Sequence, residues 1–219
     1  MKKYLTILAV LISALTASAQ NGESAWGIRA AFDINVPSKL GGRLNDEKLD
    51  LFRTGFGGTL GAVYTHYFND YIFLEPGASL YYDTYSFKDL IIMDESAGIG
   101  ETDPSLYKVG VRIPLMIGYS YYFLESLPMR FFTGPELSYA FAGNVRIKNK
   151  QLLGDDFDLS LFGKNGFMNR VDFAWKIGIG FETSIATICI DAAFGLTDQY
   201  KDHLTLHENR LSISLTHYF

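Results

Sequence analysis

Two histidines, His66 and His217, stand within apolar segments and are the first candidates for catalysis. Histidine can act as the general base for a serine nucleophile, the pairing that hydrolyses esters. No serine lies two positions from either histidine, where its neighbour on the same face of a strand would be. A serine on an adjacent strand remains the one route to such a pair. The sequence therefore predicts no catalytic residue and keeps a hydrolase as an alternative.

A second pair, His203 and His207, is spaced four residues apart and could bind a metal ion together with Asp202 or Glu208. Two histidines in a polar stretch are more often solvated, however. The acidic cluster over 155–158 is not followed by the glycine and distal glutamate of a calcium loop. A single cysteine excludes a disulfide framework and a multi-cysteine metal site. We therefore expect no metal and no cofactor.

A larger set of charged residues recurs on the polar side of otherwise apolar segments. Its seven acids are Asp33, Glu75, Asp83, Glu136, Asp172, Glu182 and Asp191, and its six bases are Arg29, Lys108, Arg112, Arg130, Lys176 and Arg210. If they share an enclosed space, these residues either pair with one another or line a path for ions or protons. Because desolvated charges are costly unless paired, their near balance favours a network of salt bridges.

The elements that would position these charges are β-strands, because apolar residues recur with a period of two from Ala25 onward. Every odd position from Val171 to Phe181 is apolar, for example, whereas even positions include Asp172 and Lys176. The same alternation predicts eight strands near residues 25–36, 55–68, 71–87, 106–123, 129–142, 169–182, 187–197 and 209–219.

The connections between these segments alternate in length. The long ones cover residues 37–54, 88–105, 143–168 and 198–208, and the short ones cover 69–70, 124–128 and 183–186. Short periplasmic turns, long extracellular loops and an even strand number are typical of transmembrane barrels. We therefore expect an all-β fold, an eight-stranded antiparallel up-and-down transmembrane β-barrel with this arrangement of turns and loops.

The direction of the two faces separates this barrel from a soluble sandwich or a lipocalin-like barrel, whose apolar face is inside. Most strand glycines, including Gly61, Gly110 and Gly178, fall on the polar face, as expected for the crowded interior of a narrow barrel. Outward aromatic residues such as Tyr119 gather near strand ends, like the girdles of membrane barrels. The apolar face is therefore predicted to contact lipid. This explains why 48% of the residues are hydrophobic although no spanning helix is evident beyond the N-terminus.

The charges that face inward would share a narrow space, because an eight-stranded barrel is only wide enough for its own side chains. A filled, salt-bridged lumen is the favoured interpretation. A narrow path for ions or protons along the same residues is the alternative.

The N-terminus has the pattern of a signal peptide, with basic Lys2 and Lys3, an apolar stretch over 4–15 and small residues at 17–19. Cleavage is predicted after Ala19, which gives a signal peptide over 1–19 and a barrel domain over 20–219. Loss of the two lysines leaves 17 Lys and Arg against 24 Asp and Glu, a net charge of −7. A negative charge without a basic run argues against a nucleic-acid partner.

Several short stretches follow one another along the chain in a characteristic order. They are Phe73–Gly77 before Tyr81 and Tyr82, Ile113–Leu115 before Tyr119–Phe123, Gly134–Glu136, Val171–Phe173 with Gly178–Gly180, Gly195–Thr197, and the closing Arg210–Phe219. With this order and spacing, the mature chain resembles the PorT-like outer-membrane β-barrel family. The resemblance implies an outer-membrane location and insertion by the barrel-assembly machinery, which recognises a C-terminal aromatic residue. Phe219 fits that role as an assembly signal.

Function is expected to lie in the loops. The connection over 88–105 carries five acids, one lysine and the apolar stretch Leu90–Met93. An ordinary extracellular loop or a strand extension is the favoured interpretation of this connection. The alternative is a loop that contacts a partner or binds divalent cations that bridge lipid phosphates. We expect a monomeric, non-enzymatic barrel in contact with outer-membrane lipid, acting structurally or through its loops, with a partner in secretion or envelope assembly. The alternatives are a narrow channel for ions or small solutes and a membrane-embedded hydrolase that modifies lipid A.

Overall fold

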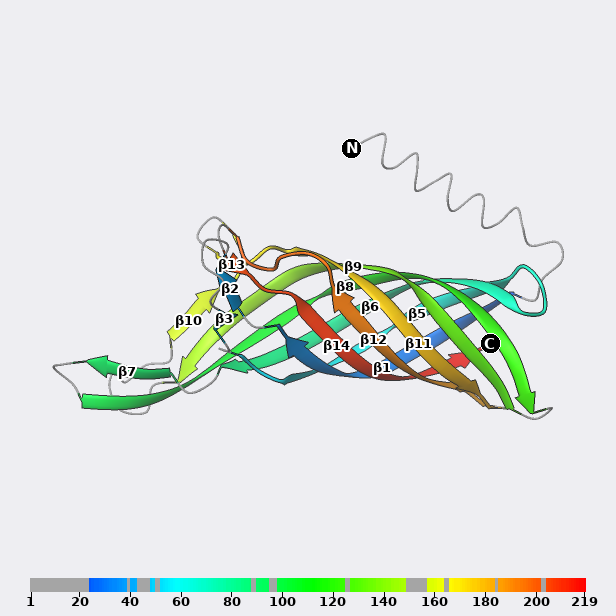
Figure 1. Ribbon diagram of the computed structural model, residues 1–219, viewed down its shortest axis with the longest axis horizontal. Coiled ribbons are helices and arrows are strands. Elements are labelled where there is room, and N and C mark those ends of the chain that lie inside the picture. The colour runs from blue at the N-terminus through cyan, green and yellow to red at the C-terminus, as the bar shows by residue number, and fades with distance from the viewer. Residues whose placement is uncertain are drawn as a thin grey trace, which may run out of the picture.

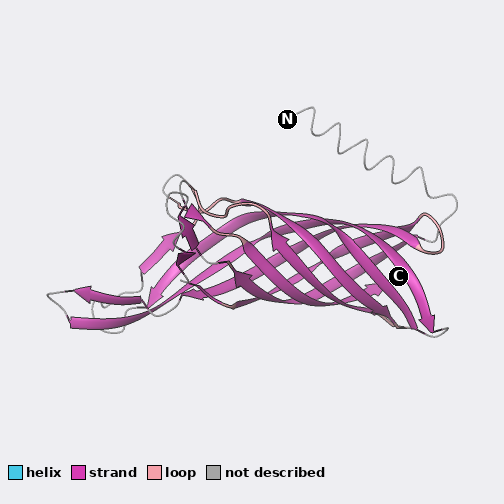
Figure 2. Ribbon diagram, viewed as in Figure 1, coloured by secondary structure: helices cyan, strands magenta, loops and turns pink. Residues whose placement is uncertain are grey.

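The computed structural model describes residues 24–38, 40–42, 48–49, 52–87, 90–94, 98–124, 127–148, 157–163, 166–183, 185–201 and 204–219. Within them, eight long strands form a closed antiparallel barrel (Figure 1, Figure 2). These strands are β1 (Ser24–Pro37), β5 (Gly55–Tyr67), β6 (Ile72–Phe87), β8 (Gly98–Leu124), β9 (Leu127–Lys148), β11 (Val171–Glu182), β12 (Thr187–Gly195) and β14 (Glu208–Tyr218). The predicted all-β, eight-stranded antiparallel barrel is confirmed.

Each of the eight strands pairs with its neighbours in sequence, and the first pairs with the last. Ile28 lies opposite His217 and Phe32 opposite Ile213 in the register between β1 and β14. The barrel wall therefore has no free edge, which satisfies the backbone hydrogen bonds that lipid cannot. The connections β5–β6, β8–β9 and β11–β12 lie at one end, here called the turn end. The other connections lie at the opposite end, the loop end.

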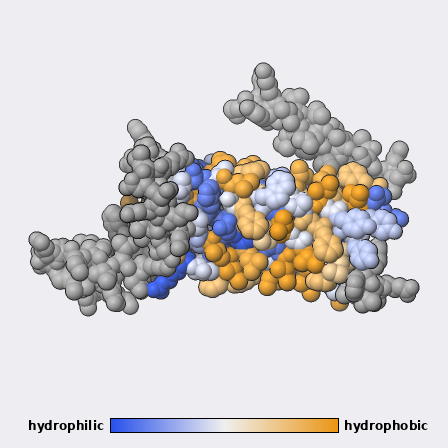
Figure 3. Space-filling view, in the orientation of Figure 1, coloured by the Kyte–Doolittle hydropathy of each residue, from blue (hydrophilic) through white to orange (hydrophobic). Residues whose placement is uncertain are grey.

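The two faces of the wall differ as the alternation predicts. Phe32 points outward and is 53% exposed, whereas Asp33, the next residue along β1, is 1% exposed inside the barrel. Apolar side chains form a broad band over the face of the wall seen in Figure 3. Large apolar residues are exposed on each of the eight long strands. An apolar exterior around a polar interior is the arrangement that lipid stabilises.

Inward glycines let large side chains lie against the wall. A Cβ atom at Gly118 would lie 2.1 Å from the ring of Phe73, and one at Gly110 would lie 2.7 Å from the ring of Tyr81. Both rings are buried in the lumen. Glycine is thus required where these two aromatic rings pack closely against the strand backbone.

Aromatic pairs mark both ends of the wall. Tyr71 and Tyr119 stack at the turn end with ring centroids 5.7 Å apart, and Tyr82 stacks on Tyr107 toward the loop end at 6.2 Å. Aromatic rings at these two ends suit the level of the lipid headgroups.

The turn between β5 and β6 is tightened by Asn69, whose Oδ1 accepts hydrogen bonds from the backbone amides of Tyr71 and Ile72.

The wall extends further at the loop end than expected. β8 begins at Gly98 and β9 continues to Lys148, so the predicted bounds of the connections over 88–105 and 143–168 are wrong. For 88–105, the structure confirms the strand extension that the sequence left open. β7 (Leu90–Asp94) pairs with the start of β8, and β10 (Phe157–Ser160) pairs with the end of β9. Strands beyond the membrane need no alternation between a lipid face and a lumen face, so their sequences lack that signal.

Shorter strands complete the loop end. β4 (Phe52–Arg53) pairs with β6, while β2 (Leu40–Gly42), β3 (Lys48–Leu49) and β13 (Leu204–Thr205) form a small separate sheet. Among the described residues, no helix is long and apolar enough to cross a membrane. The predicted signal peptide over 1–19 and its cleavage site lie outside these residues.

Candidate functional site in the barrel lumen

The turn-end half of the lumen is organised around one carboxylate, that of Glu75 on β6. Its Oε1 accepts a hydrogen bond from Arg29 Nη2 at 2.6 Å, and its Oε2 accepts one from Arg130 Nη2 at 3.0 Å. The hydroxyl groups of Thr65 and Tyr218 also donate to Oε2, at 2.7 and 2.8 Å. We call these five residues the Glu75 cluster. Two cations and two hydroxyl donors on one buried carboxylate compensate for its loss of hydration.

Arg130 extends this cluster toward the turn end. Its Nε lies 3.3 Å from Glu182 Oε1 on β11, and its guanidinium carbon lies 4.0 Å from the centroid of the Phe73 ring. The guanidinium is therefore held by two carboxylates and an aromatic face at once.

A second group of charges occupies the middle of the lumen. Arg112 on β8 donates from Nη1 to Asp33 Oδ2 at 2.8 Å and from Nη2 to Asp83. Arg210 on β14 donates to Glu136, and its Nε lies 3.7 Å from Asp33 Oδ1. We call Asp33, Asp83, Arg112, Glu136 and Arg210 the Arg112 cluster. It connects β1, β6, β8, β9 and β14 across the lumen.

Lys176 links the Arg112 cluster to β12. Its Nζ lies 2.9 Å from Asp191 Oδ1 and 3.8 Å from Glu136 Oε2. Nearer the loop end, Lys108 forms an ion pair with Glu208, the first residue of β14. A continuous set of charges therefore runs along most of the lumen.

Twelve of the thirteen charged residues predicted to face the lumen take part in ion pairs among the described residues, the exception being Asp172. These twelve are Arg29, Asp33, Glu75, Asp83, Lys108, Arg112, Arg130, Glu136, Lys176, Glu182, Asp191 and Arg210. Asp172 instead accepts a hydrogen bond from the Thr197 hydroxyl at 2.7 Å.

The partners of these charges that sequence reasoning missed include Thr65, Glu208 and Tyr218. Glu208 was assigned to the connection over 198–208, whereas β14 begins at this residue. Tyr218 occupies a polar-face position between His217 and Phe219, and this alternation was the signal that places its hydroxyl inside. Thr65 has the same signal, because it lies between the outward Tyr64 and His66 positions.

The side chains of the clusters fill most of the described lumen. Two cavities lie between them, with volumes of about 20 and 30 Å³. Each has room for about one water molecule. A lumen of this kind matches the width expected of an eight-stranded barrel, which leaves space for its own side chains and little else.

An apolar cluster closes the loop end above these charges. Leu161, Phe162, Met168 and Leu206 from the loop-end connections are buried against strand residues including Tyr85. We call these four residues the mouth cap. Lys201 supports its backbone, because Nζ donates to the carbonyl oxygens of Gly163 and Gly166 at 2.9 and 2.8 Å. The sequence did not predict this cap, since its residues lie in connections without alternation.

The candidate catalytic histidines have different surroundings. His66 occupies an outward register position, and its ring is 2% exposed and packs edge-on against Phe68. Its Nδ1 lies 2.9 Å from Ser24 Oγ on β1, the adjacent-strand serine that the sequence left open. His217 Nδ1 contacts the Ile185 carbonyl oxygen at 2.7 Å.

The candidate metal ligands are only partly described. His207 Nε2 lies 3.6 Å from Asp198 Oδ1, and its Nδ1 lies 3.2 Å from the Thr197 carbonyl oxygen. His203 and Asp202 lie outside the described residues, as do Asp155 and Asp156. Within the described part of the chain, no group of three or more His, Cys, Asp or Glu is placed to hold a metal ion.

A closed antiparallel barrel with an apolar outer wall, aromatic ends and a charge-paired interior defines a transmembrane β-barrel protein. The chain belongs to the family described as outer membrane protein beta-barrel domain, whose model matches residues 18–216. It is thus an outer-membrane protein, with the turn end toward the periplasm and the loop end outside.

The chain is also similar to several solved structures. Neisserial surface protein A is 14% identical, with a TM-score of 0.47 and coverage of 90% of this chain and 99% of that one. OprG from Pseudomonas aeruginosa is 14% identical, with a TM-score of 0.47 and coverage of 90% and 97%. Ail from Yersinia pestis is 14% identical, with a TM-score of 0.40 and coverage of 90% and 99%. No curated protein matches the sequence.

Proposed function

We propose that this outer-membrane barrel acts through a protein partner bound at its extracellular end, and that it belongs to the PorT-like part of its family, with a partner in secretion or envelope assembly. The observation that carries the proposal is the division of the chain into two regions. The lumen is occupied by paired charges beneath the mouth cap. β8 and β9, in contrast, continue beyond the wall and are widened by β7 and β10.

The packed lumen favours this role over conduction. The Glu75 cluster and the Arg112 cluster place buried guanidinium groups across the interior, and the cavities between side chains are water-sized. Moving an ion past them would require breaking several desolvated salt bridges, each costly to open. Planar-bilayer recordings of the purified protein test this step. We expect no stable open-channel current, and such a current would contradict the closed lumen.

The extracellular extension offers a surface for a partner. The hairpin of β7 with the first residues of β8 projects from the loop end in line with the wall (Figure 1). Strands outside the membrane can accept an added strand through backbone hydrogen bonds. Five acids and one lysine over 88–105 favour a partner with a basic surface.

Photocrosslinking in cells tests the partner directly. A photoreactive residue replaces Ile91 on β7 or Leu159 on β10, and the matched control replaces Leu60, which is exposed on the lipid-facing wall of β5. We expect the same protein to be captured from Ile91 and Leu159 but not from Leu60. Deletion of residues 90–102 should abolish capture from Leu159 while the barrel still shows heat-modifiable migration. Failure of both loop-end positions to capture a shared protein would contradict the proposal.

A further inference from the structure

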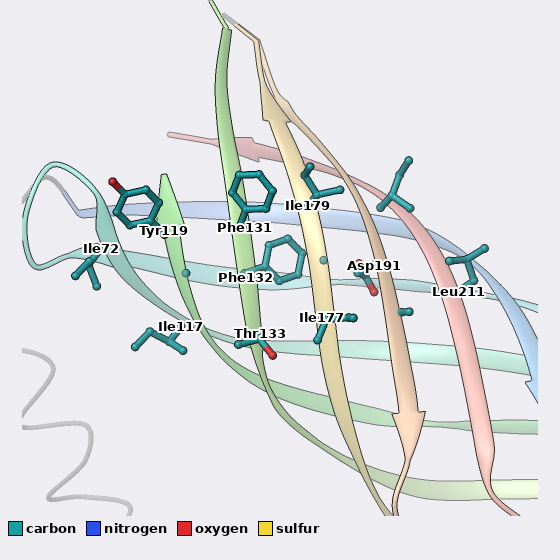
Figure 4. Close-up of a pocket in the computed structure, with 14 residues that line it drawn as sticks. Ile72, Ile117, Tyr119, Phe131, Phe132, Thr133, Ile177, Ile179, Asp191 and Leu211 are labelled. Atoms are coloured by element: carbon teal, nitrogen blue, oxygen red, sulfur yellow. The ribbon is translucent and has the colours of Figure 1, made fainter. Parts of the chain in front are cut away.

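In the described part of the outer wall there is a hollow that neither the lumen nor the loops explain. It has a volume of about 760 Å³ and extends over the apolar face from β6 to β14, across β8, β9, β11 and β12 (Figure 4). Its lining is almost entirely apolar and includes Ile117, Phe131, Ile177, Ile190 and Leu211. We call this hollow the wall groove.

Short outward side chains create the wall groove. Thr133 on β9 and Ala192 on β12 lie on either side of Ile177 in the strand register, and both point outward. Their neighbours Phe131, Ile177 and Ile190 are longer and stand exposed around them. A row of long residues interrupted by two short ones leaves a depression that another apolar group must fill in the membrane, because an empty one would lose dispersion contacts.

The hydroxyl group of Thr133, at the centre of the wall groove, is already hydrogen-bonded within the wall. Thr133 Oγ1 accepts a hydrogen bond from Trp175 Nε1 at 2.9 Å and donates to the Lys176 carbonyl oxygen at 3.0 Å. With its hydroxyl satisfied on both sides, Thr133 offers mainly its methyl group. The occupant that fits is therefore a flexible hydrocarbon without polar atoms of its own.

The wall groove begins at the turn end of the wall and runs past its middle. Ile72, which lines it, is the first residue of β6, directly after the turn, and Ile179 lies three residues before the end of β11. Leu211, at the other end of the groove, is the fourth residue of β14 from the loop end. The stacked pair of Tyr71 and Tyr119 stands at this margin, where tyrosines meet lipid headgroups. The groove is therefore reached from the periplasmic leaflet, which consists of phospholipid.

We propose that the wall groove binds one acyl chain of a periplasmic-leaflet phospholipid as a specifically held lipid. The groove is continuous with the lipid-contacting wall, so none of the described residues has to move for the acyl chain to enter. The Tyr71–Tyr119 margin is the place where the glycerol backbone and headgroup of that lipid would lie.

Photolabelling in a defined bilayer tests the proposal. The mature protein is placed in phosphatidylethanolamine nanodiscs that contain a small fraction of phosphatidylethanolamine with a diazirine in its acyl chain. Labelled peptides are then identified by mass spectrometry. We expect labelling of peptides that contain Ile117, Thr133 and Ile177 to exceed that of outward residues on β1 and β5 by about tenfold, which corresponds to about 1.4 kcal/mol of binding preference.

Ala192→Leu fills the wall groove, and Ala30→Leu is its matched control, an outward alanine on β1 between Leu60 and Leu215. We expect Ala192→Leu to reduce the groove labelling to the level of the rest of the wall and Ala30→Leu to leave it unchanged. Equal labelling around the wild-type wall would overturn the proposal, and this arm does not depend on the variants folding. Crosslinks between two copies of the protein, formed from a photoreactive residue that replaces Ile177, would also overturn it and would indicate a second copy as the occupant.

Discussion

Arg130 and Glu75 meet inside the barrel, with Nη2 3.0 Å from Oε2, although they come from strands that are not neighbours. Arg130 is on β9 and Glu75 on β6, and β8 separates them in the wall. Arg29 reaches the same carboxylate from β1. One buried acid thus connects three strands across the turn-end lumen, so the stability of the whole barrel depends on it.

Replacement of Glu75 by glutamine tests this dependence. Glu75→Gln keeps the shape of the side chain but leaves two buried guanidinium groups without their shared carboxylate. We expect a loss of about 3–5 kcal/mol in the free energy of unfolding, the usual cost of breaking a buried ion pair. Urea unfolding of the refolded protein in lipid vesicles, followed by heat-modifiable migration, measures it. Glu182→Gln is the matched control, because its side chain is 27% exposed. We expect that change to cost about 1 kcal/mol or less, and equal losses from the two variants would refute the central role of Glu75.

The alternation of residue types was sufficient to predict the barrel wall. Asp33 beside Phe32, or Asp172 beside Phe173, indicates which face each side chain takes once strands are assumed, and the lipid-facing direction follows from the glycines. The extensions at the loop end were not predictable in this way. β7 includes Leu90–Met93, four consecutive apolar residues with no alternation to distinguish a strand from a connection.

The identity of each ion pair was also beyond the sequence. Alternation places Glu75 and Arg130 inside, but their contact depends on the stagger between strands, which sets which inward residues share a level. The Lys108–Glu208 pair depends in addition on β14 starting one residue earlier than predicted. Charge balance therefore indicated a paired lumen without indicating the pairs.

A charge on the lipid-facing wall should destabilise the barrel. Ile177 lies outward near the middle of β11, and Ile177→Arg would place a guanidinium group in hydrocarbon. We expect a cost of about 2–4 kcal/mol at this depth. Ile185→Arg is the control, because Ile185 lies in the turn between β11 and β12 and is 75% exposed. Near the interface the same charge costs about 0–1 kcal/mol. Urea unfolding in vesicles compares the two variants, and similar losses would be inconsistent with a membrane wall at Ile177.

The C-terminal residue should matter for assembly more than for packing. Phe219 is exposed, and its contribution to the wall is a backbone hydrogen bond from its amide to the Trp26 carbonyl oxygen at 2.9 Å. We expect deletion of Phe219 to reduce the amount of folded, heat-modifiable protein in the outer membrane, whereas Phe219→Tyr keeps an aromatic terminus and assembles normally. Normal assembly of the deletion variant would argue against its role as the assembly signal.

The mouth cap should be separable from the barrel. Leu161 is fully buried in the cap, and Leu161→Ala removes buried volume at a cost of about 2–5 kcal/mol in local packing. Because the cap lies above the wall, we expect faster proteolysis within 157–168 with little change in the unfolding of the strands. Leu159→Ala, at an exposed position on β10, is the matched control and should leave proteolysis unchanged. Equal protease resistance of the two variants would show that Leu161 does not hold the cap.

The Ser24–His66 pair gives the hydrolase alternative a direct test. A serine hydrolase needs a third group that orients the histidine and donors that stabilise the oxyanion. Among the described residues, the His66 ring packs edge-on against Phe68 and forms a hydrogen bond with Ser24. We therefore expect purified protein to leave the acyl chains of lipid A unchanged by mass spectrometry, and cells with and without the protein to have the same lipid A. If acyl chains are removed, Ser24→Ala should abolish the loss while Ser214→Ala, a buried lumen serine, should not. That pattern would make the barrel an enzyme and place the nucleophile at the periplasmic end of β1.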